Sequence, residues 1–429
     1  MLFRSQRMPP SLPKSVGSTM GFGLRPTLPI FTVIFLRFMG AASLPAVSQT
    51  AEPTTEITDS GPVVHELCAK RVALLGESPV HGFGKTLEFK VELVQRLIRQ
   101  CHYNALFVES GIYDYINIQK KLNSGQDVTD SMISAAIGGL WATNEVRPLI
   151  PFLRKKVKAG NLTLGGLDDQ IGAGTYASRQ MSSDLVRFLP GDEKSHCLAI
   201  LNRHMLWQYT KDAPYSPADK TKIVGCLNQI EARLSPPGKS DAARAEADRA
   251  MIDSLKRNFA RDFTLDLTKN DQAVMWRNAR DHSMYLNFQW LQTRLPPHSK
   301  IIVWAATVHL AKDLSGVSGD GGSLPLGSYI RRDFGDQAFT LGFSAYSGTY
   351  VVVRPPVRPL SAAPDNSLEA QSFADLDANT VYLNLKQLRK LGSVPARPLG
   401  ADFKTARWDE VLDGLVVFRE ERAPKYLDP

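Results

Sequence analysis

The hydrophobic positions of this chain follow two different periods. Between residues 71 and 168, short apolar runs typical of buried strands alternate with segments whose apolar residues recur at helical spacing. This alternation is typical of βαβ units, in which parallel strands form a sheet and helices cover it. We therefore expect an α/β fold with a mostly parallel central sheet flanked by helices. The predicted strands are 71–75, 104–108, 162–166, 301–305, 338–343, 349–353, 380–384 and 414–418.

The region from about 175 to 295 has another pattern. It is polar and rich in Arg and Ala, with helical periodicity and no convincing strand. We expect a large helical insertion between the third and fourth strands, forming one wall or a cap over the strand ends. Its predicted helices are 193–210, 219–233, 241–263 and 269–293, and Ser235-Pro236-Pro237-Gly238 separates the middle two. Residues 354–378, rich in Pro, Ala and Asp, are expected to form a loop.

The N-terminal region is typical of a secretory signal peptide. Residues 1–26 contain basic and no acidic side chains, and residues 28–46 are largely apolar. A membrane anchor is the alternative, but Arg37 interrupts the apolar run, and a span needs about 20 apolar residues. We expect a periplasmic or secreted protein without stable membrane association after cleavage. The expected division is a signal peptide over 1–50, a linker over 51–63 and a single α/β domain over 64–425.

Charge and cysteine content narrow the class of protein further. The formal net charge is +8, but basic residues are scattered and do not form a run with aromatic residues, so nucleic-acid binding is disfavoured. The four cysteines contain no CxxC pair. Their positions favour the disulfides Cys68–Cys101 and Cys197–Cys226, in keeping with export, and the alternative is four buried thiols.

The candidate chemistry lies where predicted strands end. Glu77 follows the first strand, His81 lies four residues further in a loop bounded by Gly76 and Gly82, and Glu109 ends the second strand. In a parallel sheet, ligands bind outside the carboxyl ends of the strands. Two further strands lead into Asp168 and His309. We therefore expect these side chains to gather at one edge of the sheet.

A histidine beside a carboxylate is suited to activating water, because the carboxylate orients the ring and stabilises its protonated form. The candidate catalytic residues are His81, Glu77, Glu109 and His309. The same types of side chain could instead bind a divalent metal, although we predict neither a metal nor another cofactor. A nucleophilic serine is disfavoured because the sequence has no G-x-S-x-G motif.

Other residues are candidates for contact with a substrate. Trp141-Ala142-Thr143-Asn144-Glu145 is expected to open a helix with Thr143 as its cap, and its Trp141 and Glu145 either line a substrate wall or serve packing and capping. Arg280 lies on a long predicted helix beside other basic residues, where a solvated basic face is the alternative. The candidate substrate-binding residues are Trp141, Glu145, Asp168 and Arg280.

An ordered set of motifs resembles the erythromycin esterase family over about residues 65–420. These motifs are Gly76-Glu77…His81-Gly82, Phe107-Val108-Glu109-Ser110-Gly111, Trp141-Ala142-Thr143-Asn144-Glu145, Gly166-Leu167-Asp168-Asp169-Gln170, Arg280-Asp281…Asn287 and Val303-Trp304-Ala305…His309. The resemblance implies an α/β core with a deep cleft at the strand ends. It also implies opening of a macrocyclic lactone by water that a histidine activates, without an acyl-enzyme serine and without a tightly bound ion.

Mapped onto this chain, the resemblance implies that His81 is the general base, Glu77 its support, and Glu109 and His309 members of the same site. The family usually spaces its first Glu and His as E-x-x-H, whereas one more residue intervenes here, and Ala306 stands where a first histidine often occurs. The same superfamily includes iron-uptake proteins that bind haem. The expected function is therefore an exported hydrolase of an ester or macrocyclic lactone, with a non-catalytic ligand-binding protein, for haem or another ligand, as the alternative.

Overall fold

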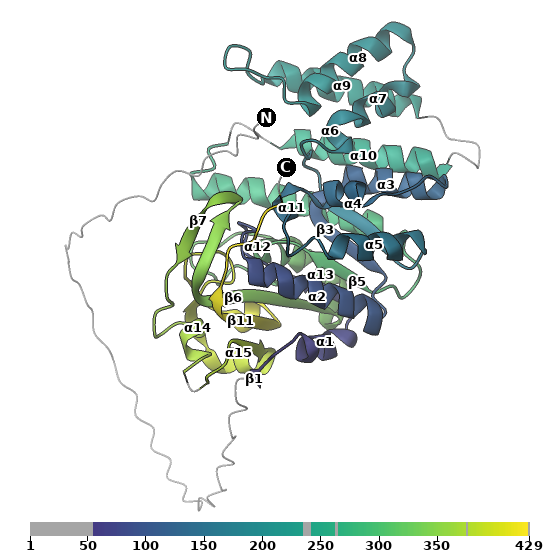
Figure 1. Cartoon of the computed structure of the whole chain (residues 1–429). Helices are drawn as coiled ribbons and strands as arrows, with labels where there is room; N and C mark the ends of the chain where they lie inside the picture. The colour runs from purple at the N-terminus through teal and green to yellow at the C-terminus, as the bar shows by residue number, and fades with distance from the viewer. Residues whose placement is uncertain (1–54, 235–241, 262–264, 375, 428–429) are drawn as a thin grey trace, which may run out of the picture. The chain divides into compact units, whose positions relative to one another are not determined.

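The computed structural model of the chain describes residues 55–234, 242–261, 265–374 and 376–427 (Figure 1). These residues belong to one compact unit. The predicted signal peptide and Ser235-Pro236-Pro237-Gly238 lie outside the described residues.

Six parallel strands form the central sheet. In spatial order they are β4 (Thr163–Asp168), β3 (Ala105–Gly111), β5 (Ile301–Trp304), β2 (Val72–Leu75), β6 (Ala338–Val352) and β11 (Gly414–Glu421). Beyond β11, β8 (Thr380–Asn384) runs antiparallel to β11, and β1 (Thr55–Glu56) runs antiparallel to β8 and completes this side of the sheet. The predicted α/β fold with a mostly parallel sheet is confirmed.

Three segments differ from the prediction. The runs 338–343 and 349–353 belong largely to one long strand, β6. The expected loop contains β7 (Arg354–Leu360) and a short helix, α14 (Leu368–Gln371). The proline-rich β7 is possible because it pairs only with β6, so its missing amide donors are tolerated at an edge. A separate two-stranded ribbon consists of β9 (Ser393–Ala396) and β10 (Lys404–Arg407).

The predicted linker also contains ordered elements. β1 pairs with β8 through Thr55 and Glu56, and α1 (Gly61–Cys68) begins within the predicted linker range. Ile57, between them, is 5% exposed and packs into the core. This burial explains why the folded unit begins before residue 64.

Helices cover both faces of the sheet, and alternate residues of each strand face opposite layers. Ala73 and Leu75 of β2 pack in one cluster with α1, α2 (Gly84–Gln100) and α5 (Leu149–Lys158). Val72 and Leu74 pack in another with α11 (Asn270–Gln292) and α13 (Leu326–Phe334). Because successive side chains of a strand point to opposite faces, both faces of the sheet are buried under helices, and the sheet is the middle one of three layers.

The helical insertion occupies the chain between β4 and β5, as predicted. It contains α6 (Tyr176–Arg179), α7 (Met181–Leu185), α8 (Gly191–Met205), α9 (Pro217–Arg233), α10 (Ala242–Ala260) and α11. Helices α6 to α10 share a hydrophobic cluster with α3 (Ile112–Asn123) and lie together in Figure 1, whereas α11 packs mainly against the sheet. Cys197–Cys226 joins α8 to α9, whereas Cys68–Cys101 joins the ends of α1 and α2. Both predicted pairings are confirmed.

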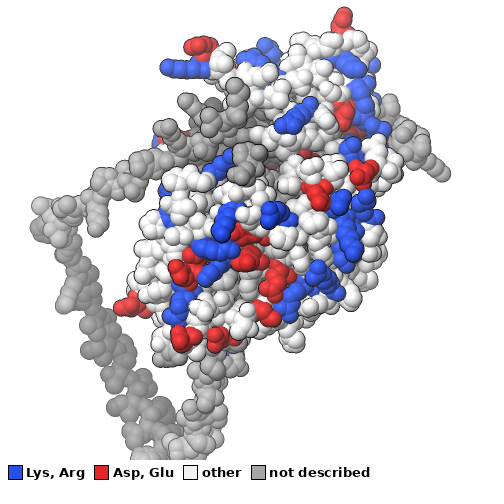
Figure 2. All heavy atoms as spheres, viewed as in Figure 1, with Lys and Arg blue, Asp and Glu red and all other residues white. Residues whose placement is uncertain are grey.

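The molecular surface carries charges of both signs. On the face in Figure 2, Lys and Arg side chains are interspersed with Asp and Glu. No helix in the described part of the chain is both long and apolar enough to cross a membrane.

Candidate active site

The loop after β2 holds His81 in an unusual backbone conformation. Its φ is +52°, in the left-handed region that few residues other than Gly adopt. The His81 amide donates to the Ser78 carbonyl. Gly82 lies so close to β6 that a Cβ there would meet the Val351 carbonyl oxygen at 1.9 Å. The loop is therefore fixed from both sides, which supports a functional reason for the strain at His81.

Four donors surround the buried carboxylate of Glu77. Its Oε1 accepts from Trp141 Nε1 at 2.8 Å and lies 2.7 Å from His81 Nδ1. Its Oε2 accepts from Lys90 Nζ at 2.8 Å and from Trp304 Nε1 at 3.2 Å. Burial raises the pKa of Glu77, but Lys90 and His81 outweigh it, so the pKa lies below its usual range. Glu77 is therefore a fixed negative charge against one nitrogen of His81.

Lys90, on α2, is one of the most completely buried side chains. It is 0% exposed, and its Nζ lies 4.3 Å from the centre of the Trp304 ring. Burial lowers the pKa of Lys90 to about 8, although Glu77 opposes this shift. Besides His81, the donors to Glu77 among the described residues are Lys90, Trp141 and Trp304. Of these three, Lys90 alone carries a full positive charge.

Glu109 forms the next part of the site. Its Oε2 accepts from the Ala306 amide at 2.7 Å, and its Oε1 accepts from Arg280 Nη2 at 2.8 Å. The same Oε1 lies 3.3 Å from His309 Nε2. Burial raises the pKa of Glu109, but His309, Arg280 and His81 together hold it far below its usual range. Glu109 therefore interacts electrostatically with both candidate histidines.

Arg280 connects Glu109 to Asp168 at the end of β4. Its Nη2 donates to Asp168 Oδ2 at 2.6 Å, and the arginine side chain is only 12% exposed. The alternative of a solvated basic face is therefore wrong for Arg280. Burial lowers the pKa of this guanidinium, but Asp168 and Glu109 raise it well above its ordinary value. Arg280 is a permanent cation between two buried carboxylates.

His309 lies on the short helix α12 (Thr307–Leu310) and has its own carboxylate. Its Nδ1 lies 2.9 Å from Asp281 Oδ1, and its Nε2 lies 2.8 Å from Arg280 Nη1. Burial lowers the pKa of His309, but Asp281 and Glu109 outweigh this effect and raise it. The site thus contains two histidine–carboxylate pairs, His81–Glu77 and His309–Asp281, with Glu109 and Arg280 connecting them.

The segment around Trp141 contributes to the site differently from the prediction. Trp141 holds Glu77 through its ring nitrogen and packs edge-on against His81, with ring centres 4.8 Å apart. The regular helix α5 begins at Leu149, eight residues after Trp141, because a turn intervenes. Thr143 Oγ1 accepts from the Val146 amide within this turn.

Glu145 is directed to the C-terminal segment. It pairs with Arg422 at 2.5 Å and accepts from the Lys425 amide. No hydrogen bond between Glu145 and either candidate histidine occurs in the described structure. Its substrate-binding role therefore stays a prediction.

The sequence reasoning missed Lys90, Trp304 and Asp281 as members of the site. Lys90 had a visible signal, because it lies three residues after Leu87 and four before Val94 on the apolar face of α2. Asp281 adjoins Arg280, but its contact with His309 depends on how α11 crosses the sheet. Within the described ranges, no group of three His, Cys, Asp or Glu side chains is placed to hold a metal ion.

Comparison with known proteins assigns the sequence of this chain to a family. The sequence model of the erythromycin esterase family matches residues 98–420. The chain belongs to the erythromycin esterase family. The match includes Glu109, Asp168, Arg280 and His309, whereas the loop with Glu77 and His81 precedes it.

Individual relatives agree with this assignment. The chain is 24% identical over 326 residues to the Bacillus subtilis (strain 168) protein named "Putative hydrolase YbfO", covering 71% of this chain and 72% of the relative. The family and this relative indicate a hydrolase.

Solved structures show the same fold. A Bacillus cereus protein has a TM-score of 0.62 at 15% identity, with 88% of this chain and 97% of that chain covered. A mutant of the erythromycin esterase EreC in its open conformation has a TM-score of 0.60 at 16% identity, with 87% and 98% covered.

Proposed function

We propose that this family member is an exported hydrolase that adds water to an ester or a macrocyclic lactone, with His81 as the general base. The observation that carries the proposal is the asymmetric environment of the His81 ring. Its Nδ1 faces Glu77, whereas no hydrogen bond from another described residue reaches its Nε2. Glu77 favours the tautomer with the proton on Nδ1, which leaves the Nε2 lone pair available to a water molecule.

The proposed reaction uses one water molecule. The water oxygen attacks the acyl carbon while one proton passes to His81 Nε2. The acyl C–O bond then breaks, and the alkoxide takes the proton back, giving a carboxylic acid and an alcohol. The guanidinium of Arg280, a permanent cation, lies close to the site and would stabilise the negative charge that develops on the carbonyl oxygen.

The remaining predicted residues have supporting roles in this proposal. Glu77 holds His81, and Glu109 with Asp168 fixes Arg280. Trp141 contributes through Glu77, and Glu145 is proposed to act at the substrate wall. Export through a signal peptide over residues 1–50 is supported by the two disulfides, which form in oxidising compartments.

The test compares His81→Ala with His196→Ala, which changes an exposed histidine on α8. Purified proteins are incubated with macrolides and generic esters, and mass spectrometry detects products that have gained water. We expect His81→Ala to lower the rate by about 10²–10⁴-fold in a protein that still folds and unfolds cooperatively, and His196→Ala to leave the rate unchanged. Equal turnover by His81→Ala would contradict the proposed base. A haemin Soret shift without hydrolysis of any ester would favour the binding-protein alternative.

Chelation provides an independent test of the metal-free chemistry. Both ring nitrogens of His309 already have protein partners, Asp281 and Arg280, so this histidine is poorly placed to ligate an ion. We expect activity to persist after dialysis against EDTA. Stoichiometric zinc whose removal abolishes activity would instead assign His81 as a ligand.

A further inference from the structure

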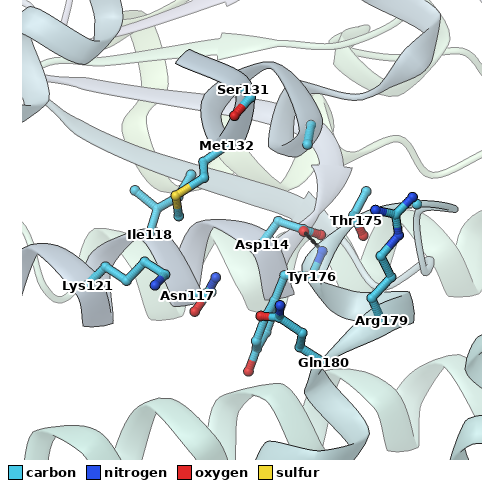
Figure 3. A pocket seen from close by; sticks show the side chains of 12 residues that line it. Asp114, Asn117, Ile118, Lys121, Ser131, Met132, Thr175, Tyr176, Arg179 and Gln180 are labelled. Carbon is cyan, nitrogen blue, oxygen red and sulfur yellow. Dashed lines mark hydrogen bonds between the residues drawn. The ribbon is translucent and has the colours of Figure 1, made fainter. Parts of the chain in front are cut away.

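A cavity of about 470 Å³ lies between α3, α4 (Asp130–Ile137) and the segment that leads into α6 (Figure 3). This volume is within the range of small-molecule pockets, about 300–1,000 Å³. The walls of the cavity follow β3 and β4 in the chain: α3 begins directly after β3, which carries Glu109, and the segment that leads into α6 follows β4, which carries Asp168. A Cβ at Gly111, at the end of β3, would lie 3.8 Å from Asp114 Oδ2 and 2.8 Å from the Gln170 carbonyl oxygen.

Two cations line this cavity without a carboxylate partner. Neither Lys121 nor Arg179 forms an ion pair within the described residues, and Lys121 Nζ donates only to the neutral amide of Gln126. In Figure 3, Lys121 and Arg179 lie on opposite sides of the cavity. Arg280, by contrast, already pairs with two carboxylates.

The one acidic side chain of the cavity already has partners. Asp114 accepts from the Tyr176 amide at 2.8 Å and is 6% exposed. Burial raises the pKa of Asp114 to about 6, although bonds from Thr175 and the start of α6 oppose this shift. The Asp114 carboxylate is therefore bonded to the backbone at the start of α6. The cavity lining contains two cations, Lys121 and Arg179, and one carboxylate.

The opposite wall provides apolar contact. Ile118 of α3 and Met132 and Ala135 of α4 line the cavity beside the side chains of Asn117 and Ser131. Two unpaired cations beside an apolar wall match an organic anion that has a short hydrocarbon part.

We propose that this cavity binds a short-chain organic acid, whose carboxylate pairs with Lys121 or Arg179 and whose chain lies on Met132 and Ile118. Its use as a subsite for acidic ester substrates rests on the proposed function. In such a bound ester, the anionic group would occupy the cavity and the scissile bond would lie toward the end of β3. The binding itself requires no catalysis.

Calorimetric titration of the full chain tests the binding directly. The probes are hexanoate, the uncharged 1-hexanol and inorganic phosphate. The variant is Lys121→Gln/Arg179→Gln, and the control is Arg147→Gln, an exposed arginine at another cavity beside α4. We expect hexanoate to bind about tenfold more tightly than 1-hexanol or phosphate, and the double variant to lose about tenfold in affinity. Arg147→Gln should bind like the unchanged protein.

Three results would each overturn the proposal: 1-hexanol binds as tightly as hexanoate, phosphate binds as tightly as hexanoate, or the double variant keeps its affinity for hexanoate.

The kinetic experiment uses monoethyl adipate and its neutral diethyl ester. A rise in KM for the monoester alone, in Lys121→Gln/Arg179→Gln, supports the subsite. Binding of hexanoate by a protein that hydrolyses no ester would refute the proposed function and leave the cavity assignment intact. Hydrolysis without hexanoate binding would do the reverse.

Discussion

Glu77 shows how burial and charge determine the role of one side chain. A carboxylate removed from water is stable only when donors replace its hydration, and four donors do so here. Two of them, Lys90 and His81, lower the pKa of Glu77 against the effect of burial. The ionised state of Glu77 is therefore maintained around neutral pH, and with it the orientation of His81.

Glu77→Gln should separate this role from packing. The amide has nearly the same shape, but its NH₂ group would face donors, and its charge is lost. We expect at least about a tenfold fall in kcat, because His81 loses the charge that orients its ring. Glu92→Gln, which removes a surface carboxylate from the same helix as Lys90, is the control. Normal kinetics together with a lowered Tm would assign Glu77 to structure alone.

Lys90→Met tests the other half of this buried pair. The methionine fills similar space but leaves Glu77 without its lysine, and breaking a buried ion pair typically costs about 3–5 kcal/mol. We expect a loss of this order in the free energy of unfolding, measured by denaturant titration. Lys155→Met, at an exposed position of α5, should change it little. In Glu77→Gln/Lys90→Met the two losses should not add, because each partner accounts for the same pair. Full additivity would refute the coupling.

At the scale of elements, the C-terminal strand stabilises the start of α2. Glu421, at the end of β11, accepts from the amides of Lys85 and Thr86 and from the Thr86 hydroxyl. Burial raises the pKa of Glu421 to about 7, although these bonds oppose the shift. The folded state therefore binds this proton more tightly than the unfolded state, whose carboxyl titrates near 4.5.

The raised pKa of Glu421 makes the stability of the folded protein depend on pH. Between about pH 4.5 and 7 the folded state holds more protons, so the Glu421 contribution to stability falls as pH rises. The full difference is on the order of 3 kcal/mol, at 1.36 kcal/mol for each unit of pKa. Glu421→Gln should flatten this part of the stability curve, measured by denaturant titration at pH 5 and pH 8. An unchanged slope would contradict the shifted pKa.

The elements also show how far the sequence predicts this structure. Glu77, Glu109, Asp168 and His309 were found because strand periodicity locates the ends of parallel strands, and those ends share an edge. The runs 338–343 and 349–353 were predicted as separate strands, whereas β6 continues between them through Gly348. Close packing requires Gly348, since a Cβ there would meet the Glu421 carbonyl oxygen at 1.9 Å. Such contacts, like that between Lys90 and Glu77, depend on how separate segments of the chain pack together. Local sequence patterns do not specify this packing.

At the scale of the whole molecule, helices α6 to α10 of the insertion share a hydrophobic cluster that is separate from those burying the sheet. This cluster includes Cys197 and Cys226 and contacts the rest of the fold through α3 and through α11, which itself packs on the sheet. Each disulfide lies in one of these regions, with Cys68–Cys101 next to the sheet. The two regions should therefore respond separately when their disulfides are removed.

Cys197→Ala/Cys226→Ala is expected to loosen the insertion while the sheet stays intact. The bond closes a loop with a sequence separation of 29 residues, for which chain entropy predicts a stabilisation of about 3–4 kcal/mol. Hydrogen exchange should accelerate in α8 and α9 and stay slow in β2, β3 and β5. Cys68→Ala/Cys101→Ala, with a similar separation of 33 residues, is the matched control and should instead affect α1 and α2. Faster exchange throughout the sheet after loss of Cys197–Cys226 would mean that the insertion and the sheet unfold as one unit.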